Sequence, residues 1–377
     1  MNIRVSRELI PLKIMRIPAS FLRALLPVLL IASGRAAVPG PFPVRGIHFL
    51  PPKPADIPQL VRFIREAMPR AGMNTLVLEV DYHYRFTKHP EVTDTDPLSK
   101  ADADAIVAAA RDAGVRVIPE IDLLGHQSWA ETTNGLLRSH PELDETPGKY
   151  PNNAGIYCRS YCPLHPALHP ILFDLIDELE DAFHADVFHG GMDEVFILAD
   201  DDCPRCHGKL TSDLFAGEVT AVHDHLAASH RQLWIWGDRL LDGAASGAGK
   251  WEASFNGTWP AINRIPRDVV ICDWHYDTAV PAAPFFAMKG FNVIACPWKK
   301  TDVALAEIAE IENIRATANP DVAARMNGLL ASTWGSAADF IRAWFGEPPA
   351  SPDVAQLVQC VRTTFDRLRA DSGPAPH

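Results

Sequence analysis

Two β-rich runs, Asn74-Thr-Leu-Val-Leu-Glu-Val80 and Val115-Arg-Val-Ile-Pro-Glu-Ile121, flank a stretch of helical periodicity near 102–113 that Gly114 closes. Both runs are almost continuously apolar, which is typical of a strand that is covered on both faces of a parallel sheet. A glycine directly after a helical pattern is a common end signal. The stretch therefore predicts a strand–helix–strand unit of a parallel sheet.

The same alternation extends in both directions along the chain. Further β-rich runs lie at 44–49, 186–190, 232–236, 268–273, 291–295 and 328–333. Helical patterns lie near 57–68, 170–184, 211–229, 281–289, 302–318 and 336–346, with only a weak, short one after the fifth run. Eight alternating units predict a (β/α)8 TIM barrel, formed as a single domain by residues 38–377.

An open doubly wound sheet is the alternative to the barrel. It would normally carry a glycine-rich phosphate turn after its first strand, and Phe49-Leu-Pro-Pro-Lys53 is not such a turn. The connection from 123 to 167 is much longer than an ordinary loop, which predicts an active-site insertion.

Residues 1–37 differ from the rest of the chain. A basic section that ends at Arg23 precedes the apolar run Ala24-Leu-Leu-Pro-Val-Leu-Leu-Ile-Ala32 and the small residues Ser33-Gly-Arg-Ala-Ala37. This order predicts a signal peptide or leader, and a secreted or periplasmic protein. A disordered cytosolic leader is the alternative. The apolar run is shorter than the ~20 residues that span a bilayer, so we expect no membrane span in the mature chain.

Charge and composition exclude some classes of partner. The formal net charge is −12 and the pI is about 5.6. Binding to nucleic acid needs a basic face, so a nucleic-acid partner is not expected. The chain also holds nine tryptophans, whose flat apolar faces with one N–H donor suit stacking on sugar rings.

Acidic and aromatic side chains follow most of the predicted strands. Active sites of TIM barrels lie at the carboxyl ends of the strands. The second, third, fourth and fifth strands are followed by Asp81, His126, Asp193-Glu194 and Trp236, and the last three by Trp274 with Tyr276, Trp298 and Trp334. Carboxylates facing aromatic surfaces are typical of glycosidases, which need an acid for the leaving oxygen and a platform for the sugar.

The motif His189-Gly-Gly-Met-Asp193-Glu194 resembles the His-x-Gly-Gly-Asp-Glu motif of glycoside hydrolase family 20, the β-N-acetylhexosaminidases. Met192 departs from that motif and is similar to a divergent subgroup with Gly-Met-Asp-Glu-Val followed by Cys-Pro-x-Cys, here Cys203-Pro-Arg-Cys206. Ile118-Pro-Glu-Ile-Asp-Leu-Leu-Gly-His126 is similar to the family's third-strand motif. The likeness covers the catalytic barrel only.

The resemblance implies an exo-acting retaining β-N-acetylhexosaminidase of carbohydrate metabolism that uses substrate-assisted catalysis and no cofactor. Glu194 is expected to be the acid and base, and Asp193 to hold the substrate's acetamido group, which acts as the nucleophile. His126, with Asp81 as its partner, is expected to support Glu194. The other expected substrate-binding residues are Trp236, Trp274, Tyr276, Trp298 and Trp334, and the expected substrates are N-acetylhexosamine-containing oligosaccharides or glycoconjugates.

The first strand departs from the family pattern. An arginine that holds the sugar's outer hydroxyls normally follows it, whereas Phe49-Leu-Pro-Pro offers none and Arg45 lies at the strand's start. His48 or Glu79 is the expected substitute, so the glycone is expected to differ from plain N-acetylglucosamine. A non-catalytic sugar-binding barrel is the rival hypothesis. A metal-dependent amidohydrolase-type barrel would need a His-x-His motif that this strand lacks.

Seven cysteines include two close pairs, Cys158 with Cys162 and Cys203 with Cys206. These four thiols can bind a structural zinc ion, with His207 as a spare ligand, or form disulfides in an oxidising compartment. Both alternatives stay open at this point. No catalytic metal is expected.

Overall fold

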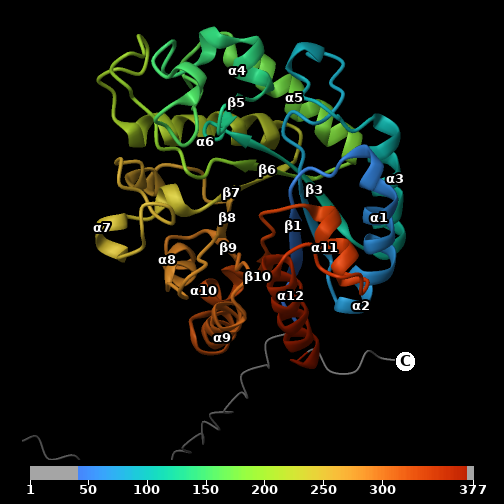
Figure 1. Ribbon diagram of the computed structural model, residues 1–377. Helices are drawn as coiled ribbons and strands as arrows, with labels where there is room; N and C mark the ends of the chain where they lie inside the picture. The colour runs from blue at the N-terminus through green and yellow to red at the C-terminus, as the bar shows by residue number, and fades with distance from the viewer. Residues whose placement is uncertain (1–40, 372–377) are drawn as a thin grey trace, which may run out of the picture. The chain divides into compact units, whose positions relative to one another are not determined.

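In the computed structural model, eight parallel strands close into a barrel of order β1-β10-β9-β8-β7-β6-β3-β2 (Figure 1). The structure describes residues 41–371, so the predicted leader at 1–37 lies outside the described residues. The strands are β1 (Val44–Phe49), β2 (Thr75–Glu79), β3 (Arg116–Leu123), β6 (Val187–Gly191), β7 (Gln232–Trp236), β8 (Val270–Asp273), β9 (Asn292–Ala295) and β10 (Met326–Ala331). The predicted TIM barrel is confirmed, because β1 pairs in parallel with both β2 and β10.

Helices surround the barrel (Figure 1). Their bounds are α1 (Ile57–Arg62), α2 (Met68–Ala71), α3 (Lys100–Ala113), α5 (Leu168–Phe183), α6 (Thr211–Ala228), α8 (Ala282–Met288), α9 (Thr301–Thr317), α10 (Pro320–Arg325), α11 (Ala337–Trp344) and α12 (Pro352–Asp371). Within 41–371, no helix is long and apolar enough to cross a membrane.

Burial and capping explain the first strand–helix–strand unit. Seven of the eight residues of β3 are buried, as expected of a strand covered by helices on one side and by the barrel core on the other. At the start of α3, Ser99 and Asp102 form a reciprocal capping box, and Gly114 ends the helix with a φ of 66°. Local capping signals and tertiary burial thus agree on the same element.

The helix after β1 is interrupted by a π-helical turn, η2 (Phe63–Ala67), between α1 and α2. Pro69 follows this turn. Proline has no N–H and its ring clashes with the carbonyl four residues earlier. The wider turn accommodates the proline without ending the helix, a detail that the apolar periodicity did not predict.

After β7 the structure has only short helical pieces, η6 (Asp238–Leu240) and α7 (Gly243–Ser246), followed by η7 (Trp259–Asn263). The expected weak, short helix after the fifth strand is therefore confirmed.

The long connection after β3 is an ordered insertion, with the hairpin β4 (Ser128–Trp129) and β5 (Thr132–Thr133) and the short helix α4 (Gly135–Ser139). The buried guanidinium of Arg159 holds its far part together: Nε donates to Asn153 Oδ1 (2.6 Å) and Nη1 to Asp144 Oδ2 (2.5 Å). Such charge-assisted bonds to a planar donor fix geometry as well as energy. The insertion therefore presents its side chains from fixed positions.

Candidate active site

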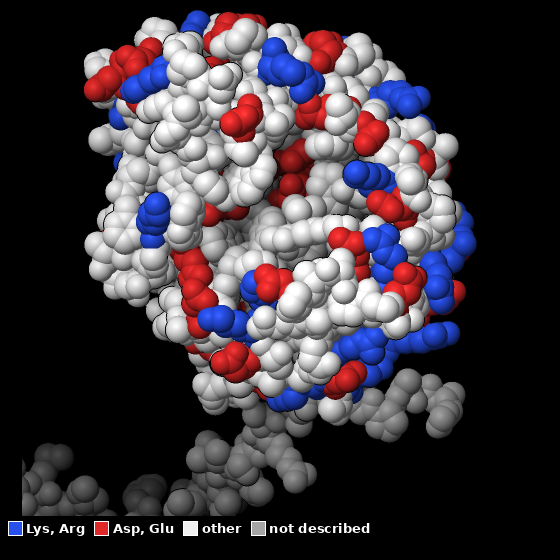
Figure 2. All heavy atoms as spheres, in the orientation of Figure 1, with Lys and Arg blue, Asp and Glu red and all other residues white. Residues whose placement is uncertain are grey.

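Acidic side chains gather at the mouth of the barrel, where the strands reach their carboxyl ends. The side chains of Glu79, Asp122, Asp193, Asp238 and Asp273 come from or directly follow β2, β3, β6, β7 and β8. Figure 2 shows a hollow in one face of the molecule with acidic side chains inside it. Closure of a parallel barrel brings residues that are distant in sequence to one rim, which is why strand-end position predicted this gathering.

The turn after β6 holds Asp193 and Glu194 on a strained backbone. Met192 and Glu194 have φ angles of 67° and 47°, in the left-handed region that residues other than glycine rarely adopt. Two carboxylates hold this turn: the N–H of Met192 donates to Asp122 Oδ1, and that of Glu194 donates to Asp238 Oδ2, each at 3.0 Å. Strain of this kind, ~1–3 kcal/mol per residue, persists only where the surroundings fix it, and it clusters at active sites.

Close packing requires glycine on both sides of this turn. A Cβ atom on Gly191 would lie 2.3 Å from Asp122 Oδ1, and one on Gly125 would lie 2.8 Å from the carbonyl oxygen of Asp193. Gly191 also has a φ of +60°. Glycine is therefore required at position 191, directly before Met192 in the motif, because β3 lies too close to β6 for a side chain there.

The imidazole of His126 lies among three carboxylates. Its Nε2 atom is 3.2 Å from Glu194 Oε2 and 3.7 Å from Asp193 Oδ2, and Asp122 Oδ2 is 3.9 Å away. Burial alone would lower the pKa of His126, but the charges of Asp122 and Asp193 and the contact with Glu194 hold it well above its ordinary value. His126 is therefore an imidazolium that offsets part of the negative charge. Asp81 is not its partner: Asp81 Oδ1 accepts the N–H of Asp122 (2.9 Å), and the φ of Asp81 is 48°.

Burial disfavours the ionised form of the Asp193 carboxyl. It raises the pKa of Asp193 to about 7; the charge of His126 opposes this shift, and the charges of Asp238 and Glu194 add to it. Burial likewise raises the pKa of Asp122 and of Asp238. Asp238 is paired with Arg239 Nε (2.5 Å), so the cluster still holds more carboxylates than cations. This excess favours positive charge in the space that the cluster faces, because a preorganised site stabilises charge that develops during a reaction.

Four of the predicted aromatic residues form one connected wall. The ring of Tyr276 stacks on Trp274 at a centroid distance of 4.9 Å and lies 5.4 Å from Trp298. Trp334 Nε1 donates a hydrogen bond to the Tyr276 hydroxyl oxygen (2.5 Å). The structure thus brings together side chains that follow β8, β9 and β10. Tyr276 lies after the sixth strand of the barrel, as its position in the sequence indicated.

The fifth predicted aromatic residue, Trp236, lies below the mouth on a buried ionic network. Its Nε1 donates to Glu120 Oε1 (3.0 Å), and Glu120 also contacts His189 Nδ1 (2.9 Å) and His48 Nε2 (3.2 Å). His48 Nε2 lies 3.3 Å from Glu79 Oε2. Sequence reasoning gave Glu120 no role; the signal was an acidic residue inside the apolar run of β3.

Within this network, the carboxylates stabilise the charged histidines and the histidines stabilise the ionised Glu120. Burial would raise the pKa of Glu120, but the imidazoliums of His189 and His48 lower it to about 2. Burial would lower the pKa of the two histidines, but the carboxylates raise it to about 9 for His48 and about 10 for His189. The floor of the mouth is therefore a set of paired ions, whereas the rim carries excess negative charge.

Tyr157, from the insertion, reaches the mouth and was missed by sequence reasoning. Its ring lies 5.7 Å from His126, 4.8 Å from Trp251 and 5.8 Å from Phe196. Beside it is an open cavity of about 320 Å³, lined by Gly155, Ile156, Tyr157, Cys158, Phe196, Ile197, Lys250 and Trp251. Only the fold of a long loop brings Tyr157 here, so no local pattern announced it.

The cysteines do not group as their spacing suggested. The Cys158 thiol faces the mouth and donates to the carbonyl oxygen of Glu194 (3.7 Å). The imidazole of His207 contacts Asp201 Oδ1 (3.1 Å) instead of a thiol. The other three thiols lie together with a carboxylate that sequence reasoning did not include: Cys162, Cys203, Cys206 and Glu145.

Comparison with known proteins supplies a match over most of this barrel. The model of the family described as "Glycosyl hydrolase family 20, catalytic domain" matches residues 76–320. The chitobiase of Flavobacterium johnsoniae is 18% identical with a TM-score of 0.59 over 88% of this chain and 52% of that one. A further β-N-acetylhexosaminidase is 18% identical, with a TM-score of 0.58 over 88% of this chain and 76% of that one.

The β-N-acetylhexosaminidase of Bacteroides fragilis is 17% identical, with a TM-score of 0.55 over 85% of this chain and 65% of that one. This chain thus spans about half the length of the chitobiase. At these identities the solved structures show a common fold, and the family match carries the assignment.

Proposed function

The chain belongs to glycosyl hydrolase family 20, and from that premise we propose that it is an exo-acting, retaining β-N-acetylhexosaminidase. The observation that carries the proposal is the pair Asp193 and Glu194, held at the end of β6 beside the imidazolium of His126. The proposed substrates are N-acetylhexosamine residues at the non-reducing ends of oligosaccharides or glycoconjugates.

In the proposed reaction, Glu194 donates its proton to the glycosidic oxygen as the bond from that oxygen to the anomeric carbon breaks. The acetamido oxygen of the substrate attacks the same carbon and forms an oxazolinium ion. Asp193 accepts the acetamido N–H and stabilises the positive charge. Glu194 then takes a proton from a water molecule whose oxygen bonds to the anomeric carbon. The bond from that carbon to the acetamido oxygen breaks, and the sugar is released with its anomeric configuration retained.

The surplus of negative charge at the rim supports this assignment. Burial raises the pKa of Asp193 to about 7, so the ionised carboxylate is poorly solvated before substrate binds. A cationic intermediate beside it replaces the missing solvation, and this interaction is stronger in the transition state than in the free enzyme. The Tyr276 hydroxyl oxygen accepts the N–H of Trp334, so the O–H of Tyr276 remains as a donor in the aromatic wall.

The proposed glycone site uses acidic side chains where the family resemblance leads one to expect an arginine. On β1, Arg45 donates from Nε to the carbonyl oxygen of Gly72 (2.8 Å) at the opposite end of the barrel. Glu79, whose side chain is 14% exposed and contacts His48, is available on the mouth side. A carboxylate accepts hydrogen bonds from sugar hydroxyls, so we propose that Glu79 replaces the arginine and changes glycone preference.

The proposed aglycone platform is the aromatic group formed by Trp129, Tyr157 and Trp251. Trp129 and Trp251 are 59% and 39% exposed, and both rings contact Tyr157. Exposed aromatic faces beside a catalytic mouth suit stacking on a second sugar ring. This platform supports an oligosaccharide as the natural substrate.

The proposed activity is tested by release of nitrophenol from 4-nitrophenyl N-acetyl-β-D-glucosaminide and from the corresponding galactosaminide. The wild type is expected to turn over at least one of them. Glu194→Gln is expected to lose ~10²–10⁴-fold in kcat/KM because the proton donor is removed. Glu66→Gln, on the outer helix surface, serves as the matched carboxylate control and is expected to retain activity.

A wild type that binds both sugars in calorimetry but hydrolyses neither would favour the rival function, a non-catalytic sugar-binding barrel. Activity on an aryl glycoside without the acetamido group, and none on the N-acetyl sugars, would favour a glycosidase with a different glycone.

We also propose that residues 1–37 direct export and are removed, which places the mature protein in the periplasm or outside the cell. The basic, apolar and small-residue order of this segment supports the proposal. Intact-mass analysis of the protein from fractionated cells tests it. A mass that includes the leader, found in the cytosolic fraction, contradicts it.

A further inference from the structure

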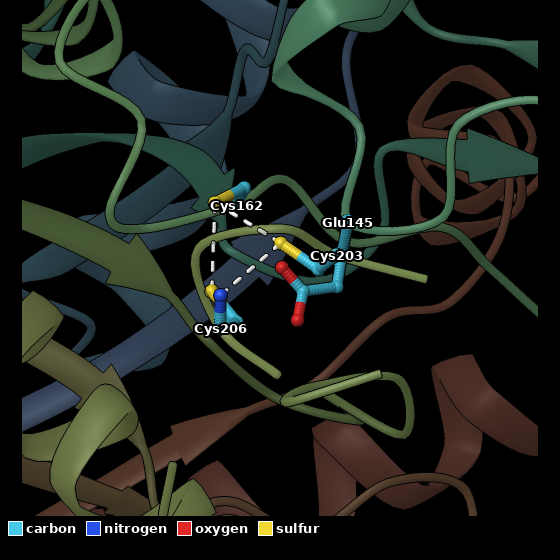
Figure 3. A group of neighbouring side chains, drawn as sticks. All are labelled: Glu145, Cys162, Cys203 and Cys206. Atoms are coloured by element: carbon cyan, nitrogen blue, oxygen red, sulfur yellow. Dashed lines mark hydrogen bonds between the residues drawn. The ribbon is translucent and has the colours of Figure 1, made fainter. Parts of the chain in front are cut away.

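Three thiols and one carboxylate lie together on the loops behind the catalytic turn (Figure 3). Glu145 and Cys162 come from the insertion after β3, and Cys203 and Cys206 come from the loop between β6 and α6. All four are buried, and one ligand atom from each lies within 4.8 Å of the others. No part of the proposed hydrolase mechanism uses these side chains.

The spacing of the sulfur atoms matches a tetrahedral metal site. Cys162 Sγ lies 3.4 Å from both Cys203 Sγ and Cys206 Sγ. Zinc–sulfur bonds of about 2.3 Å in a tetrahedron place sulfurs ~3.7 Å apart, close to these distances. The backbone N–H of Cys206 also donates to Cys203 Sγ (3.4 Å).

The carboxylate of Glu145 supplies an independent sign of a missing cation. Glu145 is fully buried. Its Oε1 accepts the N–H of Asp200 (3.2 Å), whereas its Oε2 has no hydrogen-bond partner. Within residues 41–371, no lysine, arginine or histidine forms an ion pair with it. A buried carboxylate without a basic partner is costly, and a bound cation removes that cost.

We propose that Cys162, Cys203, Cys206 and Glu145 bind one Zn²⁺ ion as a structural site. Three sulfurs and one oxygen in tetrahedral arrangement are a ligand set that zinc accepts, and a soft thiolate set disfavours magnesium and calcium. Binding releases the thiol protons to solvent and forms three Zn–S bonds and one Zn–O bond. A disulfide would consume two sulfurs and leave Glu145 Oε2 still without a hydrogen-bond partner.

The ion joins two loops that both reach the catalytic residues. The insertion carries Cys158, which contacts the Glu194 carbonyl, and the β6–α6 loop itself contains Asp193 and Glu194. The two loops also meet at the ion pair of Lys149 Nζ with Asp200 Oδ1 (2.8 Å). Zinc therefore acts as a positioning element that fixes the insertion against the catalytic turn, and it takes no part in the reaction.

Metal analysis of the full-length wild type, purified without chelator and dialysed against metal-free buffer, tests the site. One equivalent of zinc per chain is expected. Cys203→Ser and Cys206→Ser are expected to lose the zinc, and Glu145→Gln to weaken its retention against a chelator. Cys360→Ser is the matched control, because this thiol is also buried but is not one of the four proposed ligands. It donates to the Trp298 carbonyl oxygen (3.0 Å). It is expected to keep one equivalent.

Cobalt substitution gives a readout that does not depend on activity or on the folding of the variants. Reduced wild type from which the metal has been removed is expected to bind one Co²⁺ and to show the intense visible bands of tetrahedral cobalt–thiolate coordination. A wild type that holds much less than one zinc and gives no such bands overturns the proposal. The proposal is also overturned if the mass of the denatured, unreduced protein is lower by the two hydrogens that one disulfide removes, and the disulfide joins any two of the three cysteines.

Discussion

Replacing His126 with glutamine should move the acid limb of the pH–rate profile to higher pH. The variant retains an amide donor toward Glu194 but removes the positive charge from the carboxylate cluster. At the 3.7 Å separation of His126 Nε2 and Asp193 Oδ2, unit charges interact by ~4.5 kcal/mol at an effective dielectric of about 20. This energy corresponds to ~3 pKa units. The His126 side chain is 18% exposed and water can enter the altered site, so we expect a smaller shift of at least ~1 unit, or ~1.4 kcal/mol.

The sign follows from the role of Asp193. It must be ionised to accept the acetamido N–H, and burial already raises its pKa to about 7. Loss of the imidazolium raises that pKa further, so less of the enzyme is ionised at a given acidic pH. Below both pKa values, kcat/KM of the variant should be ~10-fold or more under that of the wild type, and the gap should narrow in alkaline buffer.

The assay is kcat/KM for the aryl N-acetyl-β-glucosaminide between about pH 4 and 10, at constant ionic strength. His225→Gln is the matched control, since His225 Nε2 also contacts a carboxylate, Asp177 Oδ1 at 2.8 Å, but on the outer helix layer. Its profile should overlay that of the wild type. An acid limb of His126→Gln that is unchanged, or displaced to lower pH, would refute the assigned electrostatic role.

Three further variants test other parts of the site. Asp193→Asn should abolish hydrolysis yet increase the free energy of unfolding near pH 8 by ~1–4 kcal/mol, because the raised pKa of Asp193 means that the fold disfavours its ionised form. This gain should vanish near pH 4, where the carboxyl is protonated in the folded wild type, and equal gains in urea titrations at both pH values would count against it. Glu120→Gln should cost ~3–5 kcal/mol by leaving the buried imidazolium of His189 without its carboxylate, while His48 keeps only Glu79. In the wild type, the stability from the raised pKa values of His48 and His189 is present below pH ~6.5 and lost as pH rises through about 9 to 10. Thermal melts of the variant should show a smaller alkaline loss, because only His48 keeps a carboxylate, that of Glu79. Tyr276→Phe should lower kcat ~10²-fold with little change in KM if its hydroxyl stabilises the acetamido oxygen in the transition state; activity within twofold of wild type would remove that role.

Much of the fold could be predicted because the signals for its strands and for its helix ends are both local in the sequence. Nearly continuous apolar runs marked the strands, and Gly72 and Gly114 marked helix ends with left-handed φ angles of 77° and 66°. The π-helical turn before Pro69 could not be predicted, since apolar periodicity does not distinguish it from an α-helix.

The partners of His126 depended on strand register, which the sequence does not specify. The pairing of β3 with β6 shifts between Glu120 and Leu123. This irregularity lies where Asp122 approaches Gly191, and Asp122 takes the place that the sequence prediction assigned to Asp81. Strand-end position therefore predicted the catalytic pair, but the supporting contacts needed the structure.

The grouping of the cysteines could not be predicted either, because it depends on contacts between residues that are distant in the sequence. Short spacing suggested that Cys158 and Cys162 act as a pair, but a turn of the insertion sends the Cys158 thiol to Glu194 and leaves Cys162 with Cys203 and Cys206. Glu145 joins them because its N–H bonds to the carbonyl oxygen of Ser160 (3.0 Å), which folds the insertion back on itself. Long loops encode such contacts in their tertiary structure and not in their spacing.

In the proposed mechanism, Asp193 and Glu194 act on a substrate whose own acetamido group is the nucleophile. The most direct test is wild-type kcat/KM on 4-nitrophenyl β-glucosaminides that carry acetyl, fluoroacetyl, difluoroacetyl and trifluoroacetyl groups on nitrogen. Each fluorine makes the carbonyl oxygen a poorer nucleophile, so kcat/KM should fall steeply and monotonically along the series. Rates that are equal across the series would contradict it, because a nucleophile from the protein or from water would not sense the substitution.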